Sequence, residues 1–230
     1  MAKRKTLSPW KPSRAEQLES IRRRVPDVIA PDLDVLFCGI NPGLYSAAVG
    51  HHFAGPGNLF WPTILATGFT PRLFTAFDEA ELLSLGFGIT NIVPRASATA
   101  DDLTLDELRA GARTVRRKVR KYKPRYLAVL GLIAYRRAFE NNKAQVGLQP
   151  DKIGASSVYL LPNPSGLNAF HQPAVLNQLF SDFRQLVRDP FFVPKPFIPA
   201  EITALRKSTA GQKAPKSIKA RTRKKASKKS

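Results

Sequence analysis

The sequence contains little cysteine and no long hydrophobic segment. Its single cysteine, Cys38, excludes a disulfide framework and any cluster held by several thiolates. No apolar run approaches the roughly 20 residues of a transmembrane helix, and the first ten residues lack the apolar core of a secretory signal. We therefore expect an intracellular protein in a reducing compartment, with no membrane-embedded part.

Acidic residues are missing from one end of the chain. Residues 206–230 carry eleven Lys/Arg and no Asp or Glu, and residues 1–24 carry eight Lys/Arg against two Glu. Most of the net charge of +20 therefore lies in the flanks, and residues 25–205 keep only +3. Basic ends of this kind serve either general solubility and attraction to polyanions or contact with nucleic-acid phosphates. Any specificity must come from the body of the chain.

The composition divides the chain into three parts. Residues 1–24 are predicted to be a basic, largely flexible N-terminal arm. Residues 25–205 are predicted to form one folded domain, closed by a proline-rich stretch at about 190–205 that wraps over it in extended form. Residues 206–230, rich in Lys, Ala and Ser, are predicted to be a disordered tail.

Short apolar runs alternate with helical patterns across the domain. Strands are predicted over Val35–Gly39, Phe87–Val93, Tyr126–Leu130 and Val158–Leu161. Helices are predicted over 15–24, 58–67, 79–85, 102–123, 131–141 and 173–187. Strands separated by helices pair in parallel. The predicted fold class is therefore α/β, a three-layer αβα domain with a short, mainly parallel central sheet.

Polar clusters follow three of the predicted strands. Asn41 stands before Pro-Gly after the first strand, Asn91 ends the second, and residues 162–168 follow the last. The carboxyl ends of parallel strands share one edge, where open α/β sheets bind their ligands. Each cluster also has an ordinary structural explanation, because Asn before Pro-Gly is common in plain turns and Asn91 can satisfy backbone groups.

The stretch from Gly50 to Asn58 adds two imidazoles, an aromatic ring and another amide among glycines and a proline. Such groups suit a flat, hydrogen-bonding ring such as a nucleobase, although His51 and His52 could equally be loop or core residues. No carboxylate or third histidine lies nearby with metal-ligand spacing, so we expect no metal. Phosphate-binding glycine motifs, a G-x-S-x-G elbow and a pair of carboxylates in the leading motif are all lacking.

Four segments together resemble the mismatch-specific uracil-DNA glycosylases, the family that includes thymine-DNA glycosylase. They are GINPGL (39–44), GHHFAGPGNLFW (50–61), GITNIVPR (88–95) and LPNPSGL (161–167). They follow the family's order and spacing within about residues 33–188. The resemblance implies a uracil-DNA glycosylase-like fold and a monofunctional, cofactor-free enzyme. Its expected partner is double-stranded DNA with a mismatched or deaminated base, and we expect a monomer.

The resemblance also implies roles for individual residues. Asn41 would position the attacking water, and Phe53 would stack on a base flipped out of the helix. The residues expected to bind the substrate are Ile40, Gly43, Ser46, His52, Phe53, Asn58 and Asn91. Those expected to enter the duplex as a wedge are Ser165, Gly166, Leu167 and Asn168.

Two positions depart from the family pattern. Ala169 stands two residues after the wedge position, where relatives commonly have arginine, so the vacated stack would depend on Leu167, Asn168 and Phe170. Ser46 stands where thymine-processing relatives tend to have alanine, which favours uracil over thymine.

Two alternatives remain open. One is another branch of the same superfamily acting mainly on uracil or deaminated purines, and the other is a non-catalytic DNA-binding protein on the same scaffold. The basic stretch from Arg113 to Arg125, with eight Lys/Arg, is equally compatible with a solvated helix face and with a DNA contact.

Overall fold

A five-stranded sheet lies at the centre of the fold, with strand order β2-β1-β3-β5-β4. The computed structural model describes residues 11–165 and 173–194. The strands are β1 (Val35–Gly39), β2 (Phe87–Asn91), β3 (Tyr126–Leu130), β4 (Gly147–Ile153) and β5 (Ser156–Leu161). β1 pairs in parallel with β2 and β3, and β3 with β5, whereas β4 runs antiparallel to β5. The sheet is therefore mainly parallel, as predicted.

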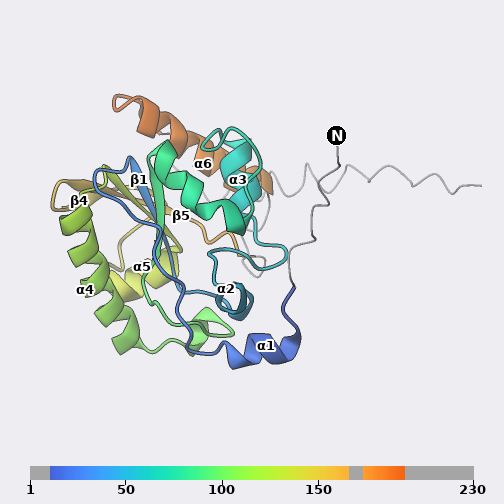
Figure 1. Cartoon of the computed structure of the whole chain (residues 1–230). Coiled ribbons are helices and arrows are strands. Elements are labelled where there is room, and N and C mark those ends of the chain that lie inside the picture. The colour runs from blue at the N-terminus through green and yellow to red at the C-terminus, as the bar shows by residue number, and fades with distance from the viewer. Residues whose placement is uncertain (1–10, 166–172, 195–230) are drawn as a thin grey trace, which may run out of the picture. The chain divides into compact units, whose positions relative to one another are not determined.

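Helices cover both faces of this sheet (Figure 1). In the described residues they are α1 (Arg14–Glu19), α2 (Leu44–Val49), α3 (Phe60–Ala66), α4 (Leu105–Tyr122), α5 (Leu132–Phe139) and α6 (Pro173–Arg188), with 3₁₀ helices η1 (Ala76–Leu85) and η2 (Ala100–Asp102). α4 and α5 pack together on one face. α3 and α6 pack together on the other, where their phenylalanines meet the rings of β1 and β5. The three-layer α/β class is thus confirmed.

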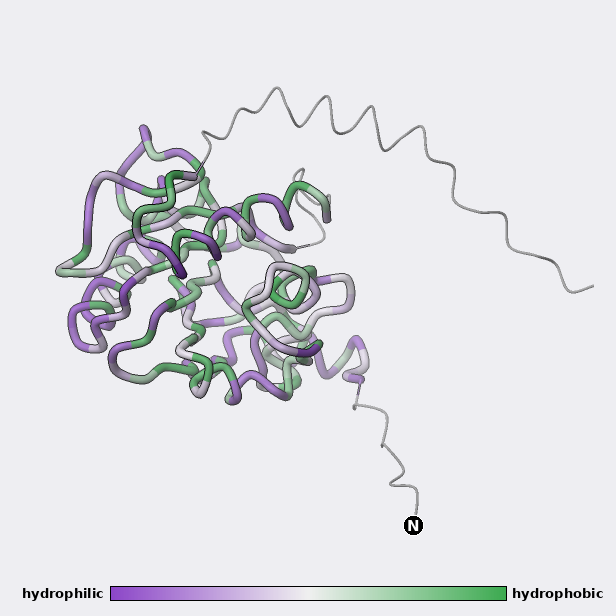
Figure 2. The backbone as a smooth tube through the Cα atoms, turned by 90° about the horizontal axis from the view of Figure 1, so that it is seen from above, coloured by the Kyte–Doolittle hydropathy of each residue, from purple (hydrophilic) through white to green (hydrophobic). Residues whose placement is uncertain are grey.

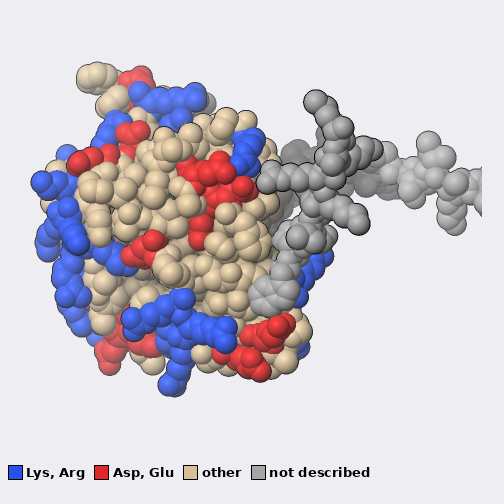
Figure 3. Space-filling model, in the orientation of Figure 1, with Lys and Arg blue, Asp and Glu red and all other residues tan. Residues whose placement is uncertain are grey.

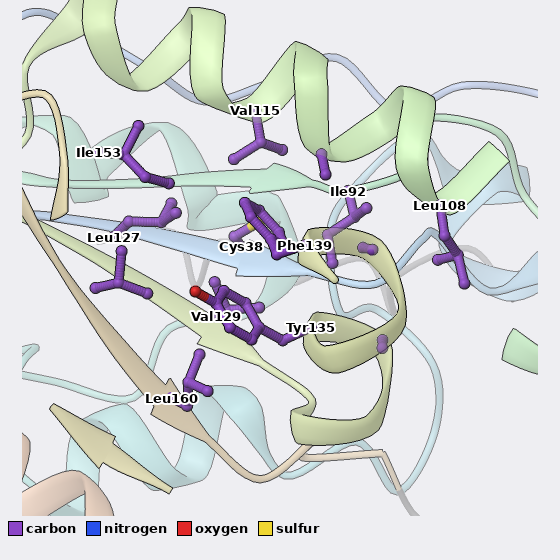
Figure 4. Packing of buried hydrophobic residues seen from close by; sticks show 14 of the residues in the cluster. Cys38, Ile92, Leu108, Val115, Leu127, Val129, Tyr135, Phe139, Ile153 and Leu160 are labelled. Atoms are coloured by element: carbon purple, nitrogen blue, oxygen red, sulfur yellow. The ribbon is translucent and has the colours of Figure 1, made fainter. Parts of the chain in front are cut away.

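Successive side chains of β1 point to opposite faces of the sheet, so the strand packs against both helical layers. Leu36 and Cys38 join the cluster under α4 and α5, in which Val115, Phe139 and their neighbours point toward one another (Figure 4). Phe37 faces the opposite side. There its ring centroid lies 5.4 Å from that of Phe60 and 5.4 Å from that of Phe69. A strand buried on both faces reads as a continuous apolar run, which is why the sequence revealed it.

Local signals determine where the long helix α4 begins and ends. The side chain of Thr104 accepts from the Glu107 N–H, and the Glu107 carboxylate accepts from the Thr104 N–H, which together form a capping box. The helix ends at Lys123, whose φ of +50° places it in the left-handed region. The chain then enters β3 after a single proline, Pro124.

Four elements differ from the sequence-based expectation. β4 was not predicted, because its exposed residues and internal Pro150 lack a strand pattern; its place at the sheet edge tolerates both. The short helix α2 was also missed, and residues 79–85 form part of a 3₁₀ helix instead of an α-helix. β2 ends at Asn91, although the N–H groups of Ile92 and Val93 continue to donate to the Gly39 and Ile40 carbonyls.

Hydrophobic stretches of the chain are short and alternate with hydrophilic ones (Figure 2). None of the helices in residues 11–165 and 173–194 combines the length and apolar character needed to cross a membrane. Residues 1–10 and 195–230, which include most of the predicted wrap and the whole tail, lie outside the described residues.

Candidate active site

A cavity of about 550 Å³ opens at the carboxyl ends of β1 and β2. This is the edge where parallel sheets bind ligands, and the volume lies within the range of small-molecule sites. Every described residue of the predicted site lines it: Ile40, Asn41, Gly43, Ser46, His52, Phe53, Asn58, Asn91 and Ser165. The structure therefore brings together residues spread over more than 120 positions of sequence.

The Asn41 carboxamide is held by its nitrogen. Nδ2 donates to Ser97 Oγ at 2.7 Å, to the Pro42 carbonyl at 3.0 Å and, at 3.5 Å, to the Arg95 carbonyl. The residue is half-buried, and within the described part of the chain Oδ1 accepts no hydrogen bond. An amide fixed in this way can present Oδ1 as an acceptor to a water in the cavity.

Ser97 is a site residue that the sequence analysis missed. Its buried hydroxyl accepts from Asn41 and donates to the Thr99 carbonyl at 2.5 Å, so it fixes the amide to the loop that forms one cavity wall. The wall continues through Ala98, Thr99, Ala100 and the exposed Asp101. The local sequence is a Ser-Ala-Thr run that begins six residues after the end of β2, and it does not indicate which group the Ser97 hydroxyl will contact.

This wall is fastened to the first turn of α4. The Arg95 guanidinium donates to both carboxylate oxygens of Glu107, at 2.5 and 2.8 Å, and to the Asp102 carbonyl at 3.0 Å. The Arg95 hydrogen bond, with help from the Thr104 N–H, lowers the pKa of Glu107 to about 2. The carboxylate is thus charged at neutral pH and keeps the loop in place.

Asn91 belongs to a chain of hydrogen bonds that ends on a backbone carbonyl. His52 Nε2 lies 2.9 Å from the Pro26 carbonyl oxygen, which can only accept, so this nitrogen carries the proton. Nδ1 is then an acceptor, and it lies 3.2 Å from Asn91 Nδ2. The His52 tautomer therefore sets which end of the Asn91 amide faces the ring and which atoms remain for a ligand.

Burial lowers the pKa of His52, which is 2% exposed, although the nearby Glu79 carboxylate opposes the shift. Glu79 accepts from the His52 N–H at 2.8 Å through one oxygen and contacts His51 Nδ1 at 2.8 Å through the other. His51 is thus tied to Glu79 at the back of the loop, and it does not line the cavity. The two adjacent histidines therefore differ in position: His52 lines the cavity, and His51 contacts Glu79 outside it.

Phe53 supplies the aromatic wall. Its φ of +53° is uncommon for a side-chain-bearing residue, and its ring stacks on Phe60 with centroids 4.1 Å apart. Gly39 lies directly behind: a Cβ there would stand 2.4 Å from Asn91 Oδ1 and 3.3 Å from the Phe53 ring. Glycine at this strand end therefore lets the amide and the aromatic ring converge on one cavity.

Two further polar residues of the cavity, Ser46 and Asn58, each use one oxygen atom to accept a backbone hydrogen bond. Ser46, at 5% exposure, accepts from the Ala54 N–H at 3.0 Å, which ties α2 to the loop before Asn58. Asn58 Oδ1 accepts from the Phe60 N–H at 2.9 Å and so turns the chain into α3. Within the described residues its Nδ2 donates no hydrogen bond, so it stays available to a ligand carbonyl.

Part of the predicted wedge can be placed. Ser165 lines the cavity, and its N–H donates to Asn163 Oδ1 at 3.0 Å. Gly166, Leu167 and Asn168, like Ala169, lie outside the described residues. Their expected insertion into a duplex stays a prediction.

The described residues bring together no group of three or more His, Cys, Asp or Glu side chains that could hold a metal ion. Cys38 points into the core under α4 and α5, and burial raises its thiol pKa to about 12. A thiol of this kind stays protonated and is no nucleophile. The described residues that line the cavity supply amides, hydroxyls, backbone groups, the neutral His52 and the exposed carboxylate of Asp101.

Residues 26–185 match the family model described as the uracil DNA glycosylase superfamily. The match starts before β1 and ends within α6, so it covers the whole sheet and every element around the cavity. It agrees with the fold class and with a cavity at the strand ends. The chain belongs to the uracil-DNA glycosylase superfamily, whose members are DNA glycosylases that act on deaminated bases.

Proposed function

We propose that this protein is a monofunctional, mismatch-directed DNA glycosylase that removes uracil from G·U pairs in double-stranded DNA, with thymine a poorer substrate. The observation that carries the proposal is the Asn41 amide. It lines a cavity large enough to admit a pyrimidine, is anchored through Nδ2, and keeps Oδ1 available for water.

The reaction breaks the bond between the sugar C1′ and the base nitrogen, and a water oxygen bonds to C1′ in its place. The proton that this water releases passes to solvent, and the departing base takes up a proton in turn. Positive charge grows on the sugar and negative charge on the departing pyrimidine. An amide has no pKa near neutrality, so Asn41 can orient the water by hydrogen bonding but cannot act as a general base. The chemistry should therefore be slow and should depend on how well the base carries negative charge.

Recognition of uracil follows from the direction of the Asn91 amide. With Nδ2 held toward His52, the amide keeps Oδ1 and one N–H for a ligand. Uracil offers an N3–H donor beside the O4 acceptor, whereas cytosine offers an acceptor beside an amino donor. An amide that cannot turn over therefore distinguishes the two bases, and we propose that His52 acts as the positioning residue.

Preference for uracil over thymine is proposed to come from Ser46. Its polar hydroxyl is buried and hydrogen-bonded to the Ala54 N–H. A thymine methyl group placed against this hydroxyl could not accept its O–H hydrogen and would shut water out, which is unfavourable. The 5-position hydrogen of uracil leaves more room.

Mismatch preference needs no direct reading of the opposite base. Flipping a nucleotide out of the duplex costs a few kcal/mol, and least at a mismatch or lesion. A G·U pair therefore gives up its uracil more readily than an A·U pair. The wedge residues 165–168 are proposed to fill the vacated stack.

The deciding experiment is a single-turnover assay with saturating enzyme, in which alkali reveals abasic sites. We expect 5-fluorouracil to be removed faster than uracil and uracil faster than thymine, and G·U to be cleaved faster than A·U. Faster release of hypoxanthine or xanthine would assign the protein to another specificity of the superfamily. Tight duplex binding without any abasic product would show a non-catalytic DNA-binding protein instead.

A further inference from the structure

The charges of the folded part are strongly divided between two consecutive segments. Residues 25–102, which supply most of the cavity wall, contain eight Asp/Glu and two Arg. Residues 103–155, which form α4, β3, α5 and β4, contain thirteen Lys/Arg and four Asp/Glu. The excess of positive charge in the described chain therefore does not lie in the segment that builds the cavity.

The cations of α4 gather on one exposed face. Arg113, Arg117, Arg120 and Lys121 are all exposed, and their spacing of three and four residues places them on the same side of the helix. We call these four residues the α4 basic face. Lys and Arg side chains form a continuous column along the edge of the molecule where α4 lies (Figure 3; compare Figure 1).

These cations are not used to hold the fold together. Within the described residues none of the four pairs with a carboxylate, whereas Arg109 and Lys118 of the same helix pair with Glu140 and Asp27. Arg117 donates only to the neutral Thr114 hydroxyl, at 3.1 Å. Lys121 Nζ lies 5.0 Å from the centroid of the Tyr122 ring, which leaves its charge uncompensated. The α4 basic face is thus a row of charges without a carboxylate partner in the described residues, suited to the regularly spaced phosphates of a nucleic acid.

This row leads away from the cavity. α4 begins at Leu105, four residues after Asp101 of the cavity wall, and at 1.5 Å per residue the basic face covers about 12 to 24 Å along the helix. Its far end lies beside the chain that enters β1: the Asp32 N–H donates to the Tyr122 carbonyl at 2.8 Å, and the Arg125 N–H to the Leu33 carbonyl at 2.8 Å. The far end of α4 therefore lies at the amino-terminal ends of the strands, whereas the cavity lies at their carboxyl ends.

We propose that the α4 basic face binds the phosphate backbone of a second segment of duplex DNA, separate from the segment presented to the cavity. A duplex laid across the carboxyl ends of the strands would not follow α4 back to the opposite edge. Contacts through side-chain charge alone are independent of sequence and fall steeply with salt. The protein could thereby bridge two duplexes or pass from one to another.

The test compares two full-length variants that lose four charges each. The first carries Arg113→Gln, Arg117→Gln, Arg120→Gln and Lys121→Gln; glutamine preserves helix propensity. The control carries Lys224→Gln, Lys225→Gln, Lys228→Gln and Lys229→Gln in the basic tail. An immobilised, mismatch-free duplex is saturated with each protein, and capture of a second labelled duplex is measured from 50 to 200 mM salt.

We expect the α4 variant to capture the second duplex several-fold less than both the wild type and the tail variant. The log–log salt slope of capture should shrink by about 3 to 4, close to 0.9 for each lost phosphate contact. Single-turnover base removal at saturating enzyme should be unchanged, which shows that the cavity is intact.

Three results would overturn the proposal: capture equal to that of the wild type, a loss no greater than in the tail variant, or weaker binding of the first duplex with unchanged capture of the second. Preferential capture of single-stranded RNA of equal length would assign the face to a different partner. None of these readouts requires base removal, so they are independent of the proposed enzymatic function.

Discussion

The segment that builds the cavity (residues 25–102) and the segment around α4 (residues 103–155) use polar groups in opposite ways. In the first, most charges are paired, and neutral amides and hydroxyls line the cavity. In the second, free cations lie on the surface above a tightly packed core. We therefore propose that recognition of a base and attraction to phosphates belong to different parts of one domain, and each can be altered separately.

The sharpest way to test the role of the cavity segment is Asn41→Ala. The variant loses the amide that orients water, and we expect single-turnover uracil release to fall by about 10²- to 10³-fold, as for other positioned polar groups. Binding to a G·U duplex should stay within a few-fold, because the phosphate contacts are untouched. A variant that keeps most of the wild-type rate would refute the assignment.

Gly39→Ala tests how closely the cavity wall is packed. The new Cβ would stand 2.4 Å from Asn91 Oδ1, so the amide must move away from its position beside His52. We expect uracil release to fall by about 10- to 100-fold, since displacements of about 1 Å at a reacting centre have such effects. Gly55→Ala is the matched control, because a Cβ there meets nothing within 4 Å although Gly55 lines the same cavity. Equal loss in both variants would show that the Asn91 position is not the cause.

Val115→Ala tests whether the core under α4 can be weakened without changing the activity of the cavity. Val115 is fully buried in the cluster under α4 and α5, and removing two methyl groups should lower the free energy of unfolding by about 2 kcal/mol. This corresponds to a Tm decrease of about 4 to 8 °C in a thermal melt. The rate of base release at saturating enzyme and 20 °C should not change; a reduced rate would mean that this core controls the cavity.

The smallest expected effect is the pH dependence that His52 confers. Burial holds its pKa below the ordinary histidine value near 6.5, while Glu79, Asp27 and His51 are the charged or titratable groups that influence it. The unfolded chain therefore takes up this proton at higher pH than the folded chain. The contribution of His52 to stability is complete above pH 6.5 and is lost as the pH falls from there toward the folded pKa.

Protonation would also place a hydrogen on Nδ1, which could no longer accept from Asn91. We expect uracil release to decline a few-fold below pH 6.5, in parallel with the His52 resonance in an NMR titration. His51→Gln is the control, since His51 contacts Glu79 but not Asn91. A rate that rises through this range would contradict the proposed positioning role.

Much of the framework was predictable from local patterns. The runs at 35–39 and 126–130 coincide with β1 and β3, because strands buried on both faces need nearly continuous apolar sequence. The capping box at Thr104 marked the start of α4. β4 escaped prediction because an edge strand can be polar and contain proline, so its sequence carries no periodic signal.

The candidate site was predictable only in part. All its described members lie on the cavity, but their roles in binding and catalysis stay predictions. Ser97 was missed because nothing in a Ser-Ala-Thr run indicates that its hydroxyl will meet an amide 56 positions earlier. The wedge at 166–168 lies outside the described residues and stays a prediction as well.

By itself, the sequence determined the fold class, the position of Asn41 after the first strand and the concentration of charge at the ends of the chain. These properties depend on neighbouring residues, whose spacing is directly visible. Only the tertiary structure decided the tautomer of His52, the direction of the Asn91 amide and the separation of the cavity from the α4 basic face. Each of these depends on groups far apart in the chain, such as Pro26, His52 and Asn91, whose hydrogen bonds exist only once the sheet has brought them together.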